Sequence, residues 1–150
     1  MWCHLPLVLG GQPVPHAQYS LRLALEPGTL VDPGLLLLKL YSDAGGDPGA
    51  EIASFNVPAI NAGSTALYTF TLTNPYLLYA NTSYWLIAQS SVTTNTYIWA
   101  NTTNATETGL AGWSISDTSV FSVNQGNNWS SSWTNSTGPF QFSVTGAELL

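Results

Sequence analysis

Five asparagines in this chain stand in the tripeptide Asn-x-Ser/Thr, whose asparagine amide nitrogen can accept an N-linked sugar. They are Asn81, Asn101, Asn104, Asn128 and Asn135. Such acceptors mark surface loops of exported proteins, so the tripeptides predict exposure to a glycosylating compartment. The alternative is that a chain rich in Asn and Thr contains the tripeptide by chance.

The chain carries very little charge. Its basic residues are Arg22 and Lys39, and charged residues make up 7% of the chain, whereas soluble proteins average about 25%. Hydroxyls, amides and attached sugars are therefore expected to keep the surface hydrated in place of charged groups. With a net charge of −6 and two basic residues, the chain has no electrostatic footprint for nucleic acid or for an anionic membrane.

Groups suited to catalysis are sparse. The histidines, His4 and His16, both lie near the start of the chain, close to the single cysteine, Cys3. Nucleophilic catalysis would also need an orienting acid beside such a pair. Several of the eight acidic residues lie in turn-like segments, where Asp favours local backbone hydrogen bonds. We therefore expect no enzymatic activity.

One acidic cluster is a weak candidate for calcium, a hard cation that prefers oxygen ligands. It consists of Asp43, Asp47 and Glu51. The spacing is not that of an EF-hand loop, and the alternative is that residues 43–49 simply form a tight hairpin connection. The sequence contains no zinc-ligand spacing, phosphate-binding loop or dinucleotide fingerprint, so no other cofactor is expected.

The six tryptophans raise the question of carbohydrate stacking. Trp85 and Trp99 lie within strand-like runs and are expected in the core. Trp113, Trp129 and Trp133 lie in the less regular stretch 101–138 and are the candidates for stacking on a sugar. Alternatively, Trp129 and Trp133 stack against glycans on their own chain, at the neighbouring acceptors.

Apolar and polar residues alternate with a period of two along much of the chain, which is typical of β-strands. Turn signals such as Pro27-Gly28 and Asn74-Pro75 separate the runs. The pattern predicts an all-β fold, an antiparallel sandwich of the jelly-roll or Greek-key kind, with little helix. The continuous apolar run at 35–42 predicts a strand buried on both faces. The expected strands span residues 18–26, 35–42, 51–57, 66–73, 83–89, 95–100 and 139–145.

The length predicts one domain, with residues 1–17 as an extended arm and residues 18–150 as the sandwich. The apolar residues of the arm are Leu5, Leu7, Val8 and Leu9. An apolar strand of this kind can complete the sheet of a neighbouring subunit, or it can fold back on its own sandwich. Pro6 limits pairing on one edge. No stretch approaches the ~20 apolar residues of a membrane helix.

From about residue 18 to residue 146 the order of motifs resembles the bacterial choice-of-anchor extracellular domains, the R type in particular. The segments that carry the resemblance are YSLRLALE, LLLLKLYSDAGGDPGAEIASF, YTFTL, LLYANTSYWLIAQ, TYIWA, TGLAGWS and GPFQFSVTG. The resemblance implies an exported β-sandwich without known catalytic residues. Family members usually end in a surface-anchoring signal, and the ending at Glu148 to Leu150 has none, so we expect assembly instead of direct anchoring.

These observations predict a non-enzymatic, extracellular structural protein of the cell surface. It is expected to be a glycosylated subunit that associates with itself into a filament or other appendage by N-terminal strand addition. Its expected partners are copies of itself and glycans. The alternative is a carbohydrate-binding or adhesion module of a secreted or cell-surface protein.

Overall fold

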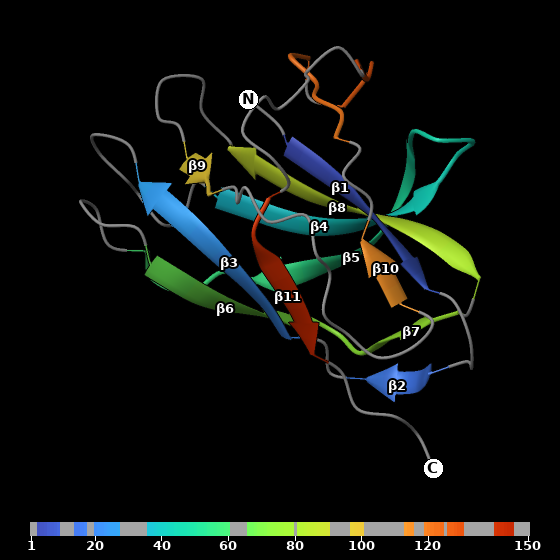
Figure 1. Ribbon diagram of the computed structural model, residues 1–150, viewed down its shortest axis with the longest axis horizontal. Helices are drawn as coiled ribbons and strands as arrows, with labels where there is room; N and C mark the ends of the chain where they lie inside the picture. The colour runs from blue at the N-terminus through green and yellow to red at the C-terminus, as the bar shows by residue number, and fades with distance from the viewer. Residues whose placement is uncertain are drawn as a thin grey trace.

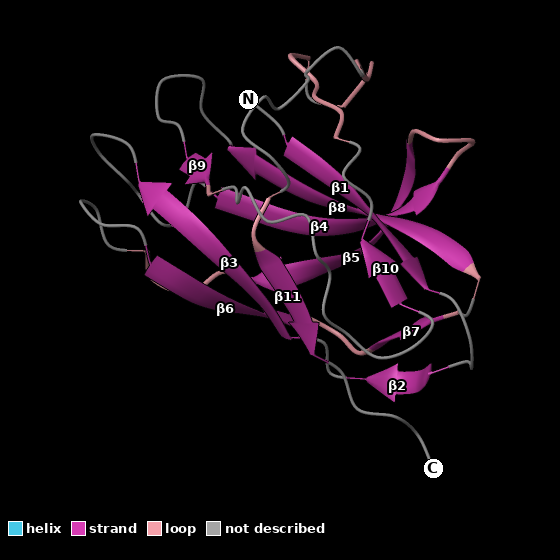
Figure 2. Cartoon of the chain, viewed as in Figure 1, coloured by secondary structure: helices cyan, strands magenta, loops and turns pink. Residues whose placement is uncertain are grey.

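The computed structural model describes residues 3–9, 14–17, 20–27, 36–60, 66–79, 81–90, 97–100, 113–115, 119–124, 126–130 and 140–145. Within these residues the regular structure is entirely β, and Figure 2 shows only strands and loops. The described part accordingly contains no helix long and apolar enough to cross a membrane. The all-β class predicted from the period-two pattern is confirmed for this part of the chain.

Each of the predicted strand segments contains a strand, and further strands lie before and between them (Figure 1). The described strands are β1 (Cys3–Leu9), β2 (Val14–Ala17), β3 (Ser20–Pro27), β4 (Leu36–Asp43), β5 (Pro48–Asn56), β6 (Ala66–Leu72), β7 (Tyr76–Leu78), β8 (Thr82–Ser90), β9 (Tyr97–Trp99), β10 (Trp113–Ile115) and β11 (Phe142–Thr145).

Nine of these strands form one antiparallel sheet in the order β10-β1-β8-β4-β5-β6-β3-β11, with β9 also paired to β3. The sheet bends at β5, because β5 pairs with β4 as far as Ser54 and then with β6 through Phe55 and Asn56. The β4–β5 ladder also contains register irregularities, and such bulges increase bending and twist. The sheet therefore curls into a half-barrel, with β4 and β8 on one limb and β3 and β6 on the other (Figure 1). Strands β2 and β7 form a separate two-stranded sheet.

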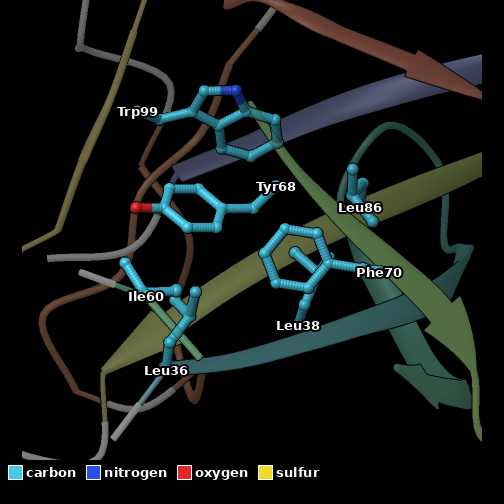
Figure 3. Close-up of a cluster of buried hydrophobic side chains, with 7 residues drawn as sticks. All are labelled: Leu36, Leu38, Ile60, Tyr68, Phe70, Leu86 and Trp99. Atoms are coloured by element: carbon cyan, nitrogen blue, oxygen red, sulfur yellow. The ribbon is translucent and has the colours of Figure 1, made fainter. Parts of the chain in front are cut away.

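The main core cluster fills the inside of this curl (Figure 3). Both limbs contribute to it, and Phe70 of β6 and Leu38 of β4 are 0% and 1% exposed. Its buried members are Leu36, Leu38, Ile60, Tyr68, Phe70, Leu86 and Trp99.

Trp99 connects this core to the start of the last described segment. Its indole Nε1 donates a hydrogen bond to the Gln141 carbonyl oxygen at 2.8 Å, and its ring centroid lies 5.3 Å from that of Phe140. Trp99 is 6% exposed and Trp85 is 2% exposed, which confirms the prediction that both are core residues.

Strand β6 follows the predicted alternation, with Tyr68 and Phe70 buried and the intervening Leu67, Thr69 and Thr71 exposed. Strand β4 does not meet the prediction of burial on both faces. Leu36, Leu38 and Leu40 are buried, whereas Leu37 and Lys39 are half-buried. The inner face of β4 meets the main core cluster. The outer face carries Lys39, which forms an ion pair with Glu51 at the surface, although its register partner Ile87 on β8 is 0% exposed.

A second cluster lies farther along the curl and contains Leu40, Leu72, Leu78 and Tyr84. Leu78 belongs to β7, a strand that the sequence pattern did not predict. Three residues directly after Asn74-Pro75 are too few to show alternation, so β7 is defined by its packing and by its pairing with β2.

Candidate functional site

The N-terminal strand β1 lies in the chain's own sheet, between β8 and β10 (Figure 1). It pairs with β8 along its whole length, from Cys3↔Ala88 to Leu9↔Thr82. The sequence left two outcomes open for this segment, addition to a neighbour's sheet and return to its own sheet. In the structure, the segment lies in the sheet of its own chain.

The four apolar residues of the arm occupy defined register positions. Leu5 and Leu7 pair with Leu86 and Tyr84, both of which are buried core residues. Val8 pairs with Ser83 on β8 and with Ser114 on β10, and Leu9 is placed between Thr82 and Trp113 in the same way. The segment that the sequence singled out for assembly is therefore an integral strand of the sheet.

Among the described strands, the outer side of β1 is paired along only part of its length. Strand β10 pairs with Leu7, Val8 and Leu9, and among the strands that the structure describes none pairs with that side at residues 3–6. Unpaired backbone groups at a sheet edge are a template for pairing with another chain. Pro6 falls in this uncovered stretch and has no N–H to offer.

The acidic residues proposed for calcium belong to the hairpin between β4 and β5. Asp43 Oδ2 accepts hydrogen bonds from the backbone N–H groups of Gly45 and Gly46 at 3.1 and 3.2 Å. Both glycines have positive φ, 78° and 99°, which a side chain would disfavour. Asp43 Oδ1 accepts a further hydrogen bond from the Trp85 indole at 2.7 Å. Both oxygens of this carboxylate therefore accept hydrogen bonds from groups of the protein itself.

Glu51 has a different partner, because its Oε2 lies 2.7 Å from the Lys39 Nζ. Tyr41 lies beside this pair, and burial raises the pKa of its phenol above the ordinary value of 10.0. Lys39 opposes that rise by attracting the phenolate, while Glu51 reinforces it through its charge and a hydrogen bond. Within the described residues, no three His, Cys, Asp or Glu side chains lie together as metal ligands would. Asp43 and Asp47 lie in the tight hairpin connection between β4 and β5, which the sequence offered as the alternative to a calcium site, and Glu51 lies in β5.

Two of the five glycan acceptors, Asn81 and Asn128, lie in the described residues, and both are exposed. Asn81 occupies the turn just before β8, with a φ of 55°, a left-handed conformation that asparagine tolerates better than most residues. Asn101, Asn104 and Asn135 lie outside the described residues.

Asn128 sits in a loop closed by the Phe121↔Ser130 bridge. Its backbone N–H donates to Asn124 Oδ1 at 3.0 Å, and the Ser122 hydroxyl, 1% exposed, donates to the same oxygen at 2.9 Å. These bonds hold the loop backbone while the Asn128 side chain remains at the surface.

Of the three tryptophans proposed for sugar stacking, Trp129 is the one whose side chain the structure describes. Trp129 is half-buried, and its ring packs against its own loop. The ring lies so close to Gly126 that a Cβ added at this glycine would come within 3.1 Å of it. Trp113 lies in β10, and Trp133 lies outside the described residues. Of the groups considered for catalysis, Cys3 and His4 are in β1, whereas His16 is in β2, in the smaller sheet.

The comparisons with known proteins do not assign the chain. No protein-family model, no curated protein and no solved structure matches it. The geometry of β1 and of the exposed acceptors therefore carries the functional argument. Sequence reasoning missed the hydrogen bond between the Trp85 indole and the Asp43 carboxylate. The two residues lie 42 positions apart, so no local sequence pattern indicates that they meet.

Proposed function

We propose that this chain is a glycosylated structural subunit of an extracellular filament or other surface appendage, and that β1 is the strand through which subunits join. The observation that carries the proposal is the position of β1, a strand from the start of the chain inserted between β8 and β10. The joined form arises when β1 leaves its own sheet and occupies the equivalent position in a neighbouring copy.

Exchange of β1 preserves the contacts that hold it. The seven residue pairs from Cys3↔Ala88 to Leu9↔Thr82 are the same whether β1 comes from its own chain or from another. Because these pairs are kept, swapping an identical element between copies is a low-cost route to association. When each copy passes β1 to the next in one direction, the contact is heterologous and produces an open polymer.

Two further features support this function. The low charge of the chain, 7%, lowers the desolvation cost of large subunit contacts. The two limbs of the curled sheet enclose a shared core, which is the arrangement expected of the β-sandwich in the extracellular choice-of-anchor domains that the sequence resembles. Membership of that group, export from a bacterium and the absence of enzymatic activity are parts of the same proposal.

A disulfide trap tests the path of β1, because the chain has a single cysteine, Cys3. Directly opposed residues of antiparallel strands have Cα atoms about 4.5–5.5 Å apart, within the range that a disulfide spans. Ala88→Cys places a second thiol opposite Cys3. Gln89→Cys is the matched control, because Gln89 is the next residue of β8 and is not the register partner of Cys3.

The native material is first inspected by negative-stain electron microscopy, and assembled Ala88→Cys protein is then oxidised and run on a denaturing gel without reductant. We expect filaments and a reducible ladder of covalent oligomers, with no ladder for Gln89→Cys. Filaments that yield only a disulfide within one chain would overturn strand addition. Dispersed monomers in every sample would overturn the filament and favour the alternative, a carbohydrate-binding or adhesion module. Deletion of residues 1–15 should likewise abolish assembly.

A further inference from the structure

Tyr79 is one of few large hydrophobic side chains that the described part of the structure leaves exposed. It is 54% exposed, and the others are Leu67 and Val123. Tyr79 directly follows β7 and stands two residues before the acceptor Asn81, in the order Tyr79-x-Asn81-x-Ser83. The turn between β7 and β8 thus presents an aromatic ring and a glycan acceptor side by side in sequence, both at the surface.

The backbone on either side of this turn is held by the fold. The Tyr79 N–H donates to the Tyr84 hydroxyl at 2.9 Å, and Tyr84 and the preceding Leu78 are each 2% exposed. Asn81 is followed at once by β8, whose first residue, Thr82, pairs with Leu9. Because consecutive Cα atoms are 3.80 Å apart, the Cα atoms of Tyr79 and Asn81 lie within about 8 Å of one another. The first sugar on Asn81 is therefore within reach of the Tyr79 ring.

We infer that Tyr79 anchors the glycan of Asn81, by packing its ring against the apolar C–H face of the first sugar. A tyrosine suits this position, because the ring supplies apolar area while the hydroxyl stays in water. Covering the ring removes apolar surface from water, which stabilises the glycosylated turn. The inference rests on the proposed glycosylation and adds to it the residue that makes one glycan part of the fold.

The attachment itself needs an activated sugar donor, a diphosphate-linked saccharide. In the transfer, the Asn81 Nδ2 forms a bond to the anomeric carbon of the sugar, and the bond from that carbon to the diphosphate oxygen breaks. The amide nitrogen gives one proton to a base of the transferring enzyme, and the diphosphate leaves with the bonding electron pair. Tyr79 takes no part in this step and acts only on the product.

Asn128 provides an internal control. The residue two positions before it is Gly126, which has no side chain, and the nearby Trp129 ring lies against that glycine. A glycan on Asn128 therefore has no equivalent of Tyr79 at the same spacing, and removing Tyr79 should not change its effect.

The test is a double-mutant cycle on protein from a glycosylating host, with occupancy of each acceptor measured by mass spectrometry of glycopeptides. The glycan is removed by Asn81→Gly, which tolerates the positive φ, and the ring by Tyr79→Ala. We expect the Asn81 glycan to raise the midpoint of thermal unfolding by about 2–4 °C, and this rise to disappear in Tyr79→Ala. Leu67→Ala, which removes another exposed apolar side chain, and Asn128→Ala should leave the rise unchanged.

Each other outcome has a separate meaning. An equal rise with and without Tyr79 would overturn the anchoring role and leave glycosylation standing. Occupancy at other acceptors but not at Asn81 would overturn the inference and leave the proposed function intact. A chain with no occupied acceptor, in the native material as well, would remove glycosylation from the proposed function too.

Discussion

The indole Nε1 of Trp85 donates a hydrogen bond to Oδ1 of Asp43 at 2.7 Å. Trp85 is 2% exposed and lies in β8, whereas Asp43 is the exposed last residue of β4. The other oxygen of the same carboxylate, Oδ2, accepts hydrogen bonds from the backbone N–H groups of Gly45 and Gly46. One side chain thus ties the β4–β5 turn to the buried indole of the neighbouring strand.

Asp43→Ala should destabilise the fold because it leaves the buried Trp85 indole without this acceptor and removes the bonds to the turn. Hydrogen bonds to charged groups contribute about 1.5–3 kcal/mol, and a loss in that range is expected in urea unfolding followed by fluorescence. Asp47→Ala is the control in the same turn, where the Asp47 carbonyl and not its carboxylate accepts a bond from Ala44. Equal losses in the two variants would contradict the role given to the Asp43 carboxylate.

Leu38→Ala and Leu67→Ala compare the same chemical change on the inside and the outside of the sheet. Leu38 is 1% exposed and Leu67 is 59% exposed. Leu38→Ala should lose about 2–5 kcal/mol of unfolding free energy through lost burial and the cavity left behind. Leu67→Ala should change the unfolding free energy by less than about 0.5 kcal/mol. Denaturant unfolding of both chains measures the difference, and a small effect at Leu38 would argue against a core inside the curl.

Glu51→Gln should cost less than about 1 kcal/mol, because an exposed ion pair gains little in water. The Lys39 and Glu51 side chains are 23% and 43% exposed, so solvent screens the attraction between Nζ and Oε2. Urea unfolding at low and at high salt measures the loss, which should shrink as salt is added. A loss that is large and independent of salt would show that the pair is shielded from water.

Stability should decline in alkaline solution partly because of Tyr41. Burial raises the pKa of its phenol above 10.0 in the folded chain, so the folded state favours the neutral form. The resulting stabilisation is fully present below a pH of about 10 and is lost as pH rises through the raised pKa. Unfolding measured from about pH 8 to about pH 11 should show a weaker decline in Tyr41→Phe than in the parent chain.

Tyr76→Phe provides a second comparison for the same effect, because burial also raises the pKa of Tyr76, with further contributions from Tyr84 and Tyr79. The two substitutions should each remove a separate share of the pH dependence, since Tyr41 lies in β4 and Tyr76 in β7. An unchanged pH profile in both variants would show that neither phenol is linked to folding.

Much of the fold could be predicted from the sequence because the alternation of side chains along a strand is a local property. The alternation at residues 66–73 predicted a strand with two distinct faces, and β6 buries one of them. The glycines and Asp43 after β4 are turn signals, and a turn lies there. The core positions of Trp85 and Trp99 followed from their place within strand-like runs. Burial of β4 on both faces was wrong, since a run of leucines does not say what covers each face.

The candidate site was predicted only as a set of residues. The sequence by itself determined that the first residues form an apolar strand, that acceptors such as Asn81 exist, and that charge is scarce. Only the tertiary structure decided that β1 pairs with β8, that Asp43 meets Trp85, and that Tyr79 and Asn81 share one exposed turn. The physical reason is that side-chain alternation depends on neighbouring residues, whereas strand pairing depends on which distant surfaces bury one another.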